Sequence, residues 1–392
     1  MTKSFCILPW MHIATNSTGN LRVCCNAVPW KSYIWKEKDK PYKIYRDDIK
    51  EAWHSDSYKD IRQQMLDGKR PEICERCFRE EDAGIKSARQ SANEQWGTDC
   101  DMTTTPEMDI RYVDLRLGNL CNLKCRMCNP ISSSMWVKDW NEAVKPEAQL
   151  PPEEIERLSK MDWPSKDTTW DNIKEIMPSV EMIYFTGGEP TLTLEQMSLL
   201  EYCIKNNYTD VTLKYNTNMT NIPERMLELW KSFKKIKVNA SIDATYRLNR
   251  YIRYPSDFEE ISNNLEILGN LPNVNIQIHT TVQMYNIMAL DQILIYFSGY
   301  DHFLNILNHP EYLNIRVLKQ KHKDLVADRL RRTYDAGVKN DKIDGIIKYM
   351  QEDWSDKWPE FVTYTKNVDK QRKENILEHI EEFNEDSNEW QS

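Results

Sequence analysis

Short apolar runs rich in β-forming residues begin near residue 110 and alternate with segments of helical pattern. The strand-like runs are Tyr112–Gly118, Met182–Thr186, Val211–Thr217, Ile236–Asp243, Val274–Val282 and Leu313–Leu318. The helical segments between them include Leu194–Asn206, Pro223–Phe233, Asp257–Asn270 and Asp291–Phe297. This repetition predicts a parallel sheet, and six such units predict an α/β fold with a partial (β/α)6 TIM-like barrel.

Polar clusters follow the ends of these strands. They are a loop with three cysteines, Gly187–Pro190, Asn216–Asn218, Ser241–Asp243 and Gln283–Asn286. Barrel enzymes carry their chemistry at the C-terminal ends of the strands. The shared placement of these clusters therefore predicts a single active site at that end of the barrel.

The regions on either side of the barrel pattern differ from it. We expect a small N-terminal cysteine-rich module of a β-hairpin and helices over residues 1–105, the barrel over 106–320, and a helical C-terminal extension over 321–392. The extension carries no chemical motif and is expected to serve packing. Residues 136–177 are longer than a simple strand-to-helix connection, and they suit a lid, a docking surface or a plain surface insertion.

Length and charge narrow the class of protein. A chain of 392 residues is long enough for two or three structural units. Its net charge of −9 argues against general nucleic-acid binding, which needs a basic surface. No apolar run reaches the roughly 18 residues that span a bilayer, and the first residues lack the apolar core of a signal peptide. We therefore expect a cytoplasmic protein without a membrane partner, in which cysteines are metal ligands or free thiols.

The central cysteines are Cys121, Cys125 and Cys128, with the spacing C-x3-C-x2-C. Three thiolates are one too few for a closed tetrahedral site or for a [4Fe-4S] cluster with a cysteine on every iron. A metal position left open by the protein is where chemistry takes place. The trio therefore predicts an enzyme.

A second set of cysteines lies near the N-terminus. The segment Ile13–Cys24 has the pattern of a β-hairpin, which would bring Cys6 close to Cys24, and Cys74-x2-Cys77 is a knuckle that holds two corners of a metal site. These four make a closed site, for which the spacing fits zinc and iron–sulfur equally well. The remaining cysteines are Cys25, expected to point away from Cys24, and Cys100 and Cys203, assigned to packing.

C-x3-C-x2-C after the first strand, followed by Gly187-Gly188-Glu189-Pro190 after the second, resembles the radical S-adenosylmethionine (SAM) superfamily over about residues 110–318. The resemblance implies a [4Fe-4S] cluster whose open iron chelates SAM. It implies reductive cleavage of SAM to a 5′-deoxyadenosyl radical that abstracts hydrogen from a substrate, with an electron donor such as flavodoxin or ferredoxin.

The resemblance also assigns roles to single residues. Cys121, Cys125 and Cys128 would ligate the cluster, and Met127 would lie near the adenine, where the family usually has an aromatic residue. Gly187 and Gly188 would let the backbone approach SAM, Glu189 would bind its amino group, Arg253 could pair with its carboxylate, and Asn216, Ser241 and Asp243 are candidates for ribose or carboxylate contacts. Strand-end capping and surface pairing explain Ser241, Asp243 and Arg253 nearly as well.

The N-terminal set resembles the start of a SPASM/twitch auxiliary-cluster domain, with Gly19-x4-Cys24 and the later C-x2-C. Such domains usually follow the barrel, whereas this one precedes it. Its cysteines suit one auxiliary [4Fe-4S] cluster held by Cys6, Cys24, Cys74 and Cys77, and the resemblance favours iron–sulfur over zinc.

Three functions are compatible with this sequence. The first is oxidative modification of a peptide or protein side chain by radical SAM chemistry. The second is dehydrogenation of a small molecule, such as an aminocyclitol or a sugar, by an enzyme of the same superfamily. The third is a non-enzymatic, zinc-stabilised interaction protein, which leaves the central trio without a fourth ligand. No catalytic base stands out.

Overall fold

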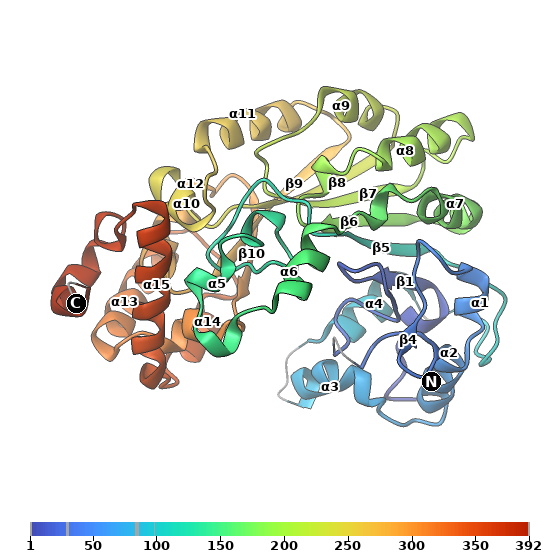
Figure 1. Ribbon diagram of the computed structural model, residues 1–392, viewed down its shortest axis with the longest axis horizontal. Helices are drawn as coiled ribbons and strands as arrows, with labels where there is room; N and C mark the ends of the chain where they lie inside the picture. Colours follow the sequence, from blue (N-terminus) through green and yellow to red (C-terminus); the bar gives the residue numbers. More distant parts are fainter. Residues whose placement is uncertain (1, 29–30, 83–85, 98, 391–392) are drawn as a thin grey trace. The chain divides into compact units, whose positions relative to one another are not determined.

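A computed structural model describes the chain except residues 1, 29–30, 83–85, 98 and 391–392 (Figure 1). The chain divides into two compact units. The first unit contains residues 1–120, 161–215 and 223–236, and the second contains residues 121–160, 216–222 and 237–392. Each unit therefore combines segments that are distant in the sequence.

The first unit is built on a mostly parallel sheet in the order β7-β6-β5-β1-β2, in which only the β1–β2 hairpin is antiparallel. Its strands are β1 (His12–Thr15), β2 (Leu21–Arg22), β5 (Tyr112–Leu117), β6 (Met182–Gly187) and β7 (Thr212–Thr217), and a separate ribbon joins β3 (Trp35–Glu37) to β4 (Lys40–Pro41). Its helices include α1 (Ile49–Trp53), α2 (Asp56–Leu66), α3 (Glu75–Asp82), α4 (Ala88–Trp96), α7 (Asp167–Ile176), α8 (Gln196–Lys205) and α9 (Glu224–Trp230).

The two faces of this sheet differ in polarity. On β5, Val113, Leu115 and Leu117 are buried, whereas the alternate positions carry Tyr112, Asp114 and Arg116. The apolar face continues through Ile183 and Phe185 on β6 and through Leu213 and Tyr215 on β7, all buried. Because side chains alternate along a strand, one face forms the core and the other is left polar.

The N-terminal module begins with the predicted hairpin. Gly19 turns the chain between β1 and β2 with a φ of +74°, and Ala14 pairs with Arg22. The sequence did not indicate that β1 also pairs in parallel with β5, His12 opposite Tyr112, so that the module extends the barrel sheet.

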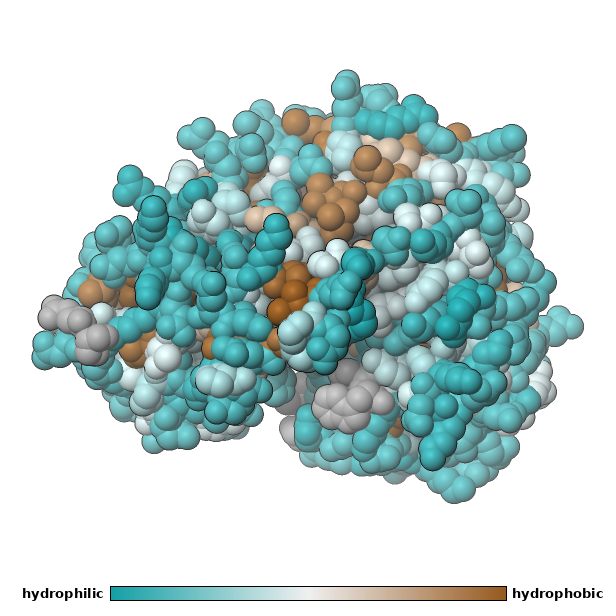
Figure 2. All heavy atoms as spheres, in the orientation of Figure 1, coloured by the Kyte–Doolittle hydropathy of each residue, from teal (hydrophilic) through white to brown (hydrophobic). Residues whose placement is uncertain are grey.

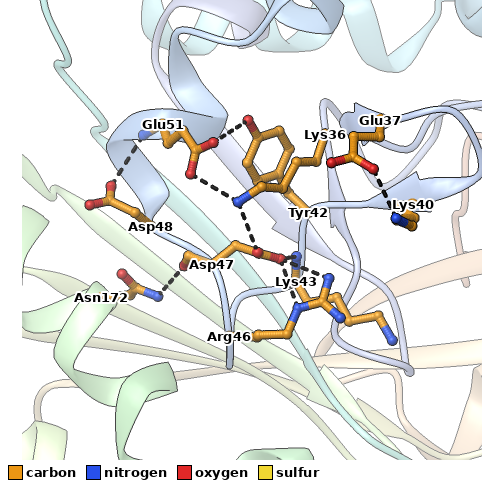
Figure 3. A network of polar contacts seen from close by, with 10 residues as sticks. All are labelled: Lys36, Glu37, Lys40, Tyr42, Lys43, Arg46, Asp47, Asp48, Glu51 and Asn172. Carbon is orange, nitrogen blue, oxygen red and sulfur yellow. Dashed lines mark hydrogen bonds and ion pairs between the residues drawn. The ribbon is translucent and has the colours of Figure 1, made fainter.

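A polar network ties the module to α7 (Figure 3). Asn172 donates to the carbonyls of Ile44 and Asp47 at 2.7 and 3.0 Å, and the Asp47 carboxylate accepts from the Lys43 amide at 2.9 Å. Lys36 reaches both Asp47 and Glu51. The contacts hold the loop before α1 in one conformation.

The second unit carries the remaining barrel strands in the order β10-β9-β8. They are β8 (Lys235–Ser241), β9 (Val274–Val282) and β10 (Asp301–Ile306), with α5 (Trp140–Ala143), α6 (Pro152–Ser159), α10 (Tyr246–Ile252), α11 (Phe258–Gly269) and α12 (Leu290–Tyr296). The chain is thus an α/β protein with a partial (β/α)6 barrel, a cysteine-rich N-terminal module and a helical C-terminal extension, as predicted.

The sixth strand is not where the sequence placed it. Residues 313–318 form short 3-10 turns, because the Asn314 side chain accepts the Arg316 amide at 3.0 Å and so starts a turn. The strand is β10, which pairs with β9 from Asp301 opposite Gln277 onward. As the end strand it is largely exposed: of its apolar residues Phe303, Leu304 and Ile306, only Leu304 is buried.

The extension contains α13 (Gln320–Asp335), α14 (Ile343–Met350), α15 (Trp358–Arg372) and α16 (Ser387–Trp390). No helix among the described residues is long and apolar enough to cross a membrane. Hydrophilic residues cover most of the face shown in Figure 2, consistent with the burial of the apolar strand positions.

Candidate active site and metal centres

The loop that carries the central cysteines is held mainly through its backbone. Cys125 is buried, whereas Cys121 and Cys128 are partly exposed. The Trp136 indole donates to the Cys125 carbonyl at 2.8 Å, and the amides of Lys124 and Arg126 donate to the carbonyls of Tyr254 and Ile252 at 2.7 and 2.8 Å. These bonds fix the loop through its backbone.

The charges around the trio favour a thiolate at Cys125. A hydrogen bond from Cys128 lowers the pKa of Cys125, and the Arg253 guanidinium lowers it further, although burial opposes both. The same hydrogen bond raises the pKa of Cys128. Arg253 forms an ion pair with Asp243 at 2.8 Å, and the Asp243 carboxylate also accepts the Thr281 amide at 2.7 Å. Burial keeps the pKa of Asp243 above its usual range.

Arg126, between two of the predicted ligands, ties the loop to the C-terminal extension. Its side chain is fully buried and donates to Asp369 and Glu374 at 2.5 and 2.9 Å. Its guanidinium stacks on the Tyr251 ring at 3.6 Å, and the Tyr364 hydroxyl donates to its carbonyl at 2.7 Å. The extension therefore does more than the packing expected of it, because it builds the outer wall of the loop.

A cavity of about 670 Å³ lies beside Met127 and Cys128. The segment that precedes α6 supplies Trp140 and Val144, and the turn after β10 and helix α15 supply Tyr312 and Tyr364. The lining is largely apolar and aromatic, and its volume suits a ligand of the size of a nucleoside or an amino-acid side chain. The first part of residues 136–177 thus helps to line a cavity rather than form a plain surface insertion.

The other predicted SAM contacts of the second unit lie at strand ends. Asn216 accepts a hydrogen bond from Asn239 at 2.6 Å. Ser241 is the last residue of β8, and Asp243 follows it two residues later. The second unit thus contains Cys121, Cys125, Cys128, Met127, Asn216, Ser241, Asp243 and Arg253. Their roles toward SAM remain predictions.

Gly187, Gly188 and Glu189 belong to the first unit and follow β6. Gly187 has a φ of +140°, and a Cβ on Gly188 would lie only 2.2 Å from the Leu120 carbonyl oxygen. The Glu189 amide donates to that same oxygen at 2.7 Å, and the Thr191 hydroxyl donates to the Glu189 carboxylate at 2.8 Å. The glycines therefore permit a backbone packing that no larger residue allows.

The four predicted N-terminal ligands line one small cavity. Cys6, Cys24, Cys74 and Cys77 surround it together with Arg89, although more than sixty residues separate the first cysteine from the last two. Cys25 is exposed and is not part of this lining. Of the two cysteines assigned to packing, Cys203 is fully buried and Cys100 is partly exposed.

Burial raises the pKa of Cys6 and of Cys74 to about 12 and raises that of Cys77 as well, and the Arg89 guanidinium opposes each rise. Arg89 is anchored by Glu81 and by the Phe5 carbonyl. Such thiols become thiolates when a metal replaces their protons. Within the described part of the chain, no three His, Cys, Asp or Glu side chains converge tightly enough to hold a single metal ion. In a four-iron cluster each thiolate binds a different iron, so the ligands line a cavity as these four do.

Family comparisons agree with this arrangement. Residues 115–287 match the model of the radical SAM superfamily, and residues 6–78 match that of the SPASM iron–sulfur cluster-binding domain. The chain therefore contains a radical SAM domain and a SPASM-type domain, and the SPASM-type domain precedes the barrel. Its cofactors are SAM, a [4Fe-4S] cluster and auxiliary iron–sulfur.

Several solved structures are similar. Streptococcus suis SuiB bound to S-adenosylmethionine has a TM-score of 0.32 and 17% identity, covering 55% of this chain and 41% of SuiB. SuiB bound to its precursor peptide SuiA has a TM-score of 0.30 and 20% identity, and the match covers 55% of this chain and 42% of SuiB. TYW1 with a lysine-pyruvate adduct has a TM-score of 0.32 and 15% identity, and the match covers 58% of this chain and 71% of TYW1. This chain thus spans about two fifths of SuiB. No curated protein sequence matches it.

Proposed function

We propose that this radical SAM enzyme oxidatively modifies a side chain of a peptide or protein. When bound, SAM and the cluster supply a one-electron reductive cleavage whose radical product removes a hydrogen atom from the substrate. Cys121, Cys125 and Cys128 would hold that cluster. Arg253, which lowers the pKa of Cys125, would stabilise its thiolate.

The observation that carries the oxidative step is the cavity shared by Cys6, Cys24, Cys74 and Cys77. Removal of a hydrogen atom leaves an unpaired electron on the substrate, and net oxidation needs an acceptor for it. An auxiliary cluster held by these four thiolates would be such an acceptor. Arg89, buried beside them, would balance part of the negative charge of the cluster.

The cavity beside Cys128 favours a peptide over a sugar or an aminocyclitol. A cyclitol carries a hydroxyl or amine on nearly every carbon, and each buried polar group needs a partner. Most of the cavity surface is apolar, with Met127, Trp140, Val144, Tyr312 and Tyr364, and polar side chains such as Lys145, Glu147 and Glu360 supply the rest. The apolar side chains suit an apolar or aromatic group, so the small-molecule reaction is the second candidate.

The test is an anaerobic assay with dithionite and SAM. Wild-type protein should form 5′-deoxyadenosine, and a pool of random peptides should increase its formation, whereas a panel of aminocyclitols and sugars should not. Stimulation by the panel alone would transfer the assignment to the second candidate. Absence of 5′-deoxyadenosine under every condition would refute the radical mechanism.

A further inference from the structure

The polar face of the first unit's sheet carries a group of side chains that have no role in the proposed reaction. Paired residues share a face, so the register places Asp114 of β5 beside Tyr184 of β6, and Tyr184 beside Lys214 of β7. Arg116 lies on the same face, opposite Thr186. Arg116 is exposed, and Tyr184 and Lys214 are partly exposed, so a ligand can reach this face.

Asp114 is the exception, because it is only 3% exposed. Its Oδ2 atom is buried and finds no hydrogen-bond partner among the described residues. Burial, with the nearby Cys25 thiol as the next cause, raises the pKa of this carboxyl well above its usual range. A buried polar atom without a partner is uncommon and calls for one that the described residues do not supply.

The Cys25 thiol helps to raise the pKa of Asp114, and a hydrogen bond with Cys24 together with burial raises the pKa of Cys25 itself. The loop that carries it is fixed by the buried Arg22, which donates to the Ser32 hydroxyl at 2.7 Å and to the Ala27 carbonyl at 2.5 Å. Cys25 is exposed, whereas its neighbour Cys24 lines the four-cysteine cavity. Cys25 is thus accessible to an external reagent, whereas Cys24 belongs to the cavity.

His12 adds a second unpartnered acceptor. Its ring lies 4.4 Å from that of Tyr112, opposite it on the neighbouring strand. Nδ1 lies 2.9 Å from the Val23 carbonyl, which can only accept, so Nδ1 carries the proton. The buried Nε2 is then an acceptor, and no described residue donates to it.

We propose that Asp114, with Cys25 beside it, binds a hydroxyl group of the substrate. A hydroxyl can donate to Asp114 or His12 and can accept from Arg116, and so it satisfies both kinds of group on this face. A cationic ligand would be repelled by Arg22, Arg116 and Lys214. This inference rests on the proposed function and names the chemistry of its substrate: a hydroxyl-bearing side chain of a peptide, or a sugar if the second candidate holds.

The test measures how fast N-ethylmaleimide alkylates Cys25 in the anaerobically reconstituted holoenzyme, with the modified residue located by peptide mass mapping. The probes are N-acetyl-threonine amide, its isosteric control N-acetyl-valine amide, and methyl glucoside. The variants are Asp114→Ala and the size-conserving Asp114→Asn. Asp210→Ala is the matched control, because Asp210 is exposed in a surface ion pair with Lys234. Iron content reports whether each variant has folded and loaded.

In wild type, the threonine compound should halve the alkylation rate at about ten-fold lower concentration than the valine compound, a difference typical of one hydrogen bond to a buried acceptor. That difference should vanish in Asp114→Ala, shrink in Asp114→Asn and persist in Asp210→Ala. Protection by methyl glucoside that depends on Asp114 also supports the hydroxyl site and points to a sugar as its source.

Three results would overturn the proposal. The threonine and valine compounds could protect equally, protection could persist in Asp114→Ala, or Cys25 could react only after the clusters are removed, which would make it a ligand. Formation of 5′-deoxyadenosine by the same wild-type preparation tests the proposed function separately. The two hypotheses can therefore fail independently.

Discussion

The Arg126 guanidinium donates to the Asp369 carboxylate although 243 residues separate the two in the sequence. Asp369 also accepts the Tyr251 hydroxyl at 2.9 Å, and its second oxygen accepts the Ile376 amide at 2.9 Å. The cysteine loop and the extension are thus joined by a buried, hydrogen-bonded ion pair. Because the pair is buried, removal of one partner should destabilise the folded protein.

Replacement of Arg126 by methionine should destabilise the protein by roughly 3–5 kcal/mol, because Asp369 and Glu374 would stay buried without their cation. Urea unfolding and iron content are the measurements, and iron should fall by about one cluster. Arg225→Met is the control: Arg225 pairs with Glu201 at the surface, so a loss below about 1 kcal/mol is expected. Equal losses in both variants would contradict the role of Arg126.

The two sets of cysteines should be separable by mutation. Alanine at Cys121, Cys125 and Cys128 should abolish 5′-deoxyadenosine formation and lower the iron content from about eight to about four per chain, if each set holds a [4Fe-4S] cluster. Alanine at Cys74 and Cys77 should remove the other four irons and spare SAM cleavage. Unchanged iron in the second variant would show that the N-terminal assignment is wrong.

Gly188→Ala should impair both folding and SAM cleavage, because the added Cβ would approach the Leu120 carbonyl oxygen to 2.2 Å and backbone would have to move. Overpacking of this kind costs about 1–3 kcal/mol. Gly269→Ala is the matched control, since a Cβ at the end of α11 meets no atom within 4 Å. That variant should be neutral or more stable by up to about 1 kcal/mol in urea unfolding.

Mild acid should destabilise the protein through His12. Burial lowers its pKa from 6.5 to about 4, so between these values the unfolded chain binds a proton that the folded one excludes. Stability is therefore lost as the pH falls from about 6.5 toward 4, by about 1 kcal/mol between pH 7.0 and 5.5. His12→Phe keeps a ring against Tyr112 and should lack this part of the loss in urea unfolding. An identical pH dependence would rule out His12 as the cause.

The barrel could largely be predicted because its strands are buried and its helices amphipathic. Val274–Val282 is β9 with the same bounds, and Asp257–Asn270 contains α11. The prediction of a strand at Leu313–Leu318 was wrong because Leu313, Ile315 and Val317 are buried in a turn just as they would be in a strand. The true end strand, Asp301–Ile306, is mostly exposed, and its apolar residues follow Asp301 and His302 and are interrupted by Asn305, which gave a weaker pattern.

Sequence motifs led to the candidate site only where they mark it. The spacing of the cysteines led to one cavity in the N-terminal module and to one loop after β5. Spacing cannot report partners from distant segments, and so Asp369 and Glu374 went unnoticed. The only sign of these partners in the sequence was Arg126 itself, a charged residue between two predicted ligands. Asp114 was hidden within a strand pattern that had already served to define the barrel.

The Arg126–Asp369 pair also dictates an order of events during synthesis. The ribosome completes the cysteine loop early, but the carboxylates that neutralise Arg126 are translated more than 240 residues later. Until then the guanidinium has no permanent counter-ion, and the loop lacks its outer wall. We therefore expect iron and sulfide to be delivered to a finished polypeptide rather than to a nascent one, with ribosome-bound chains that end before Asp369 failing to retain the central cluster.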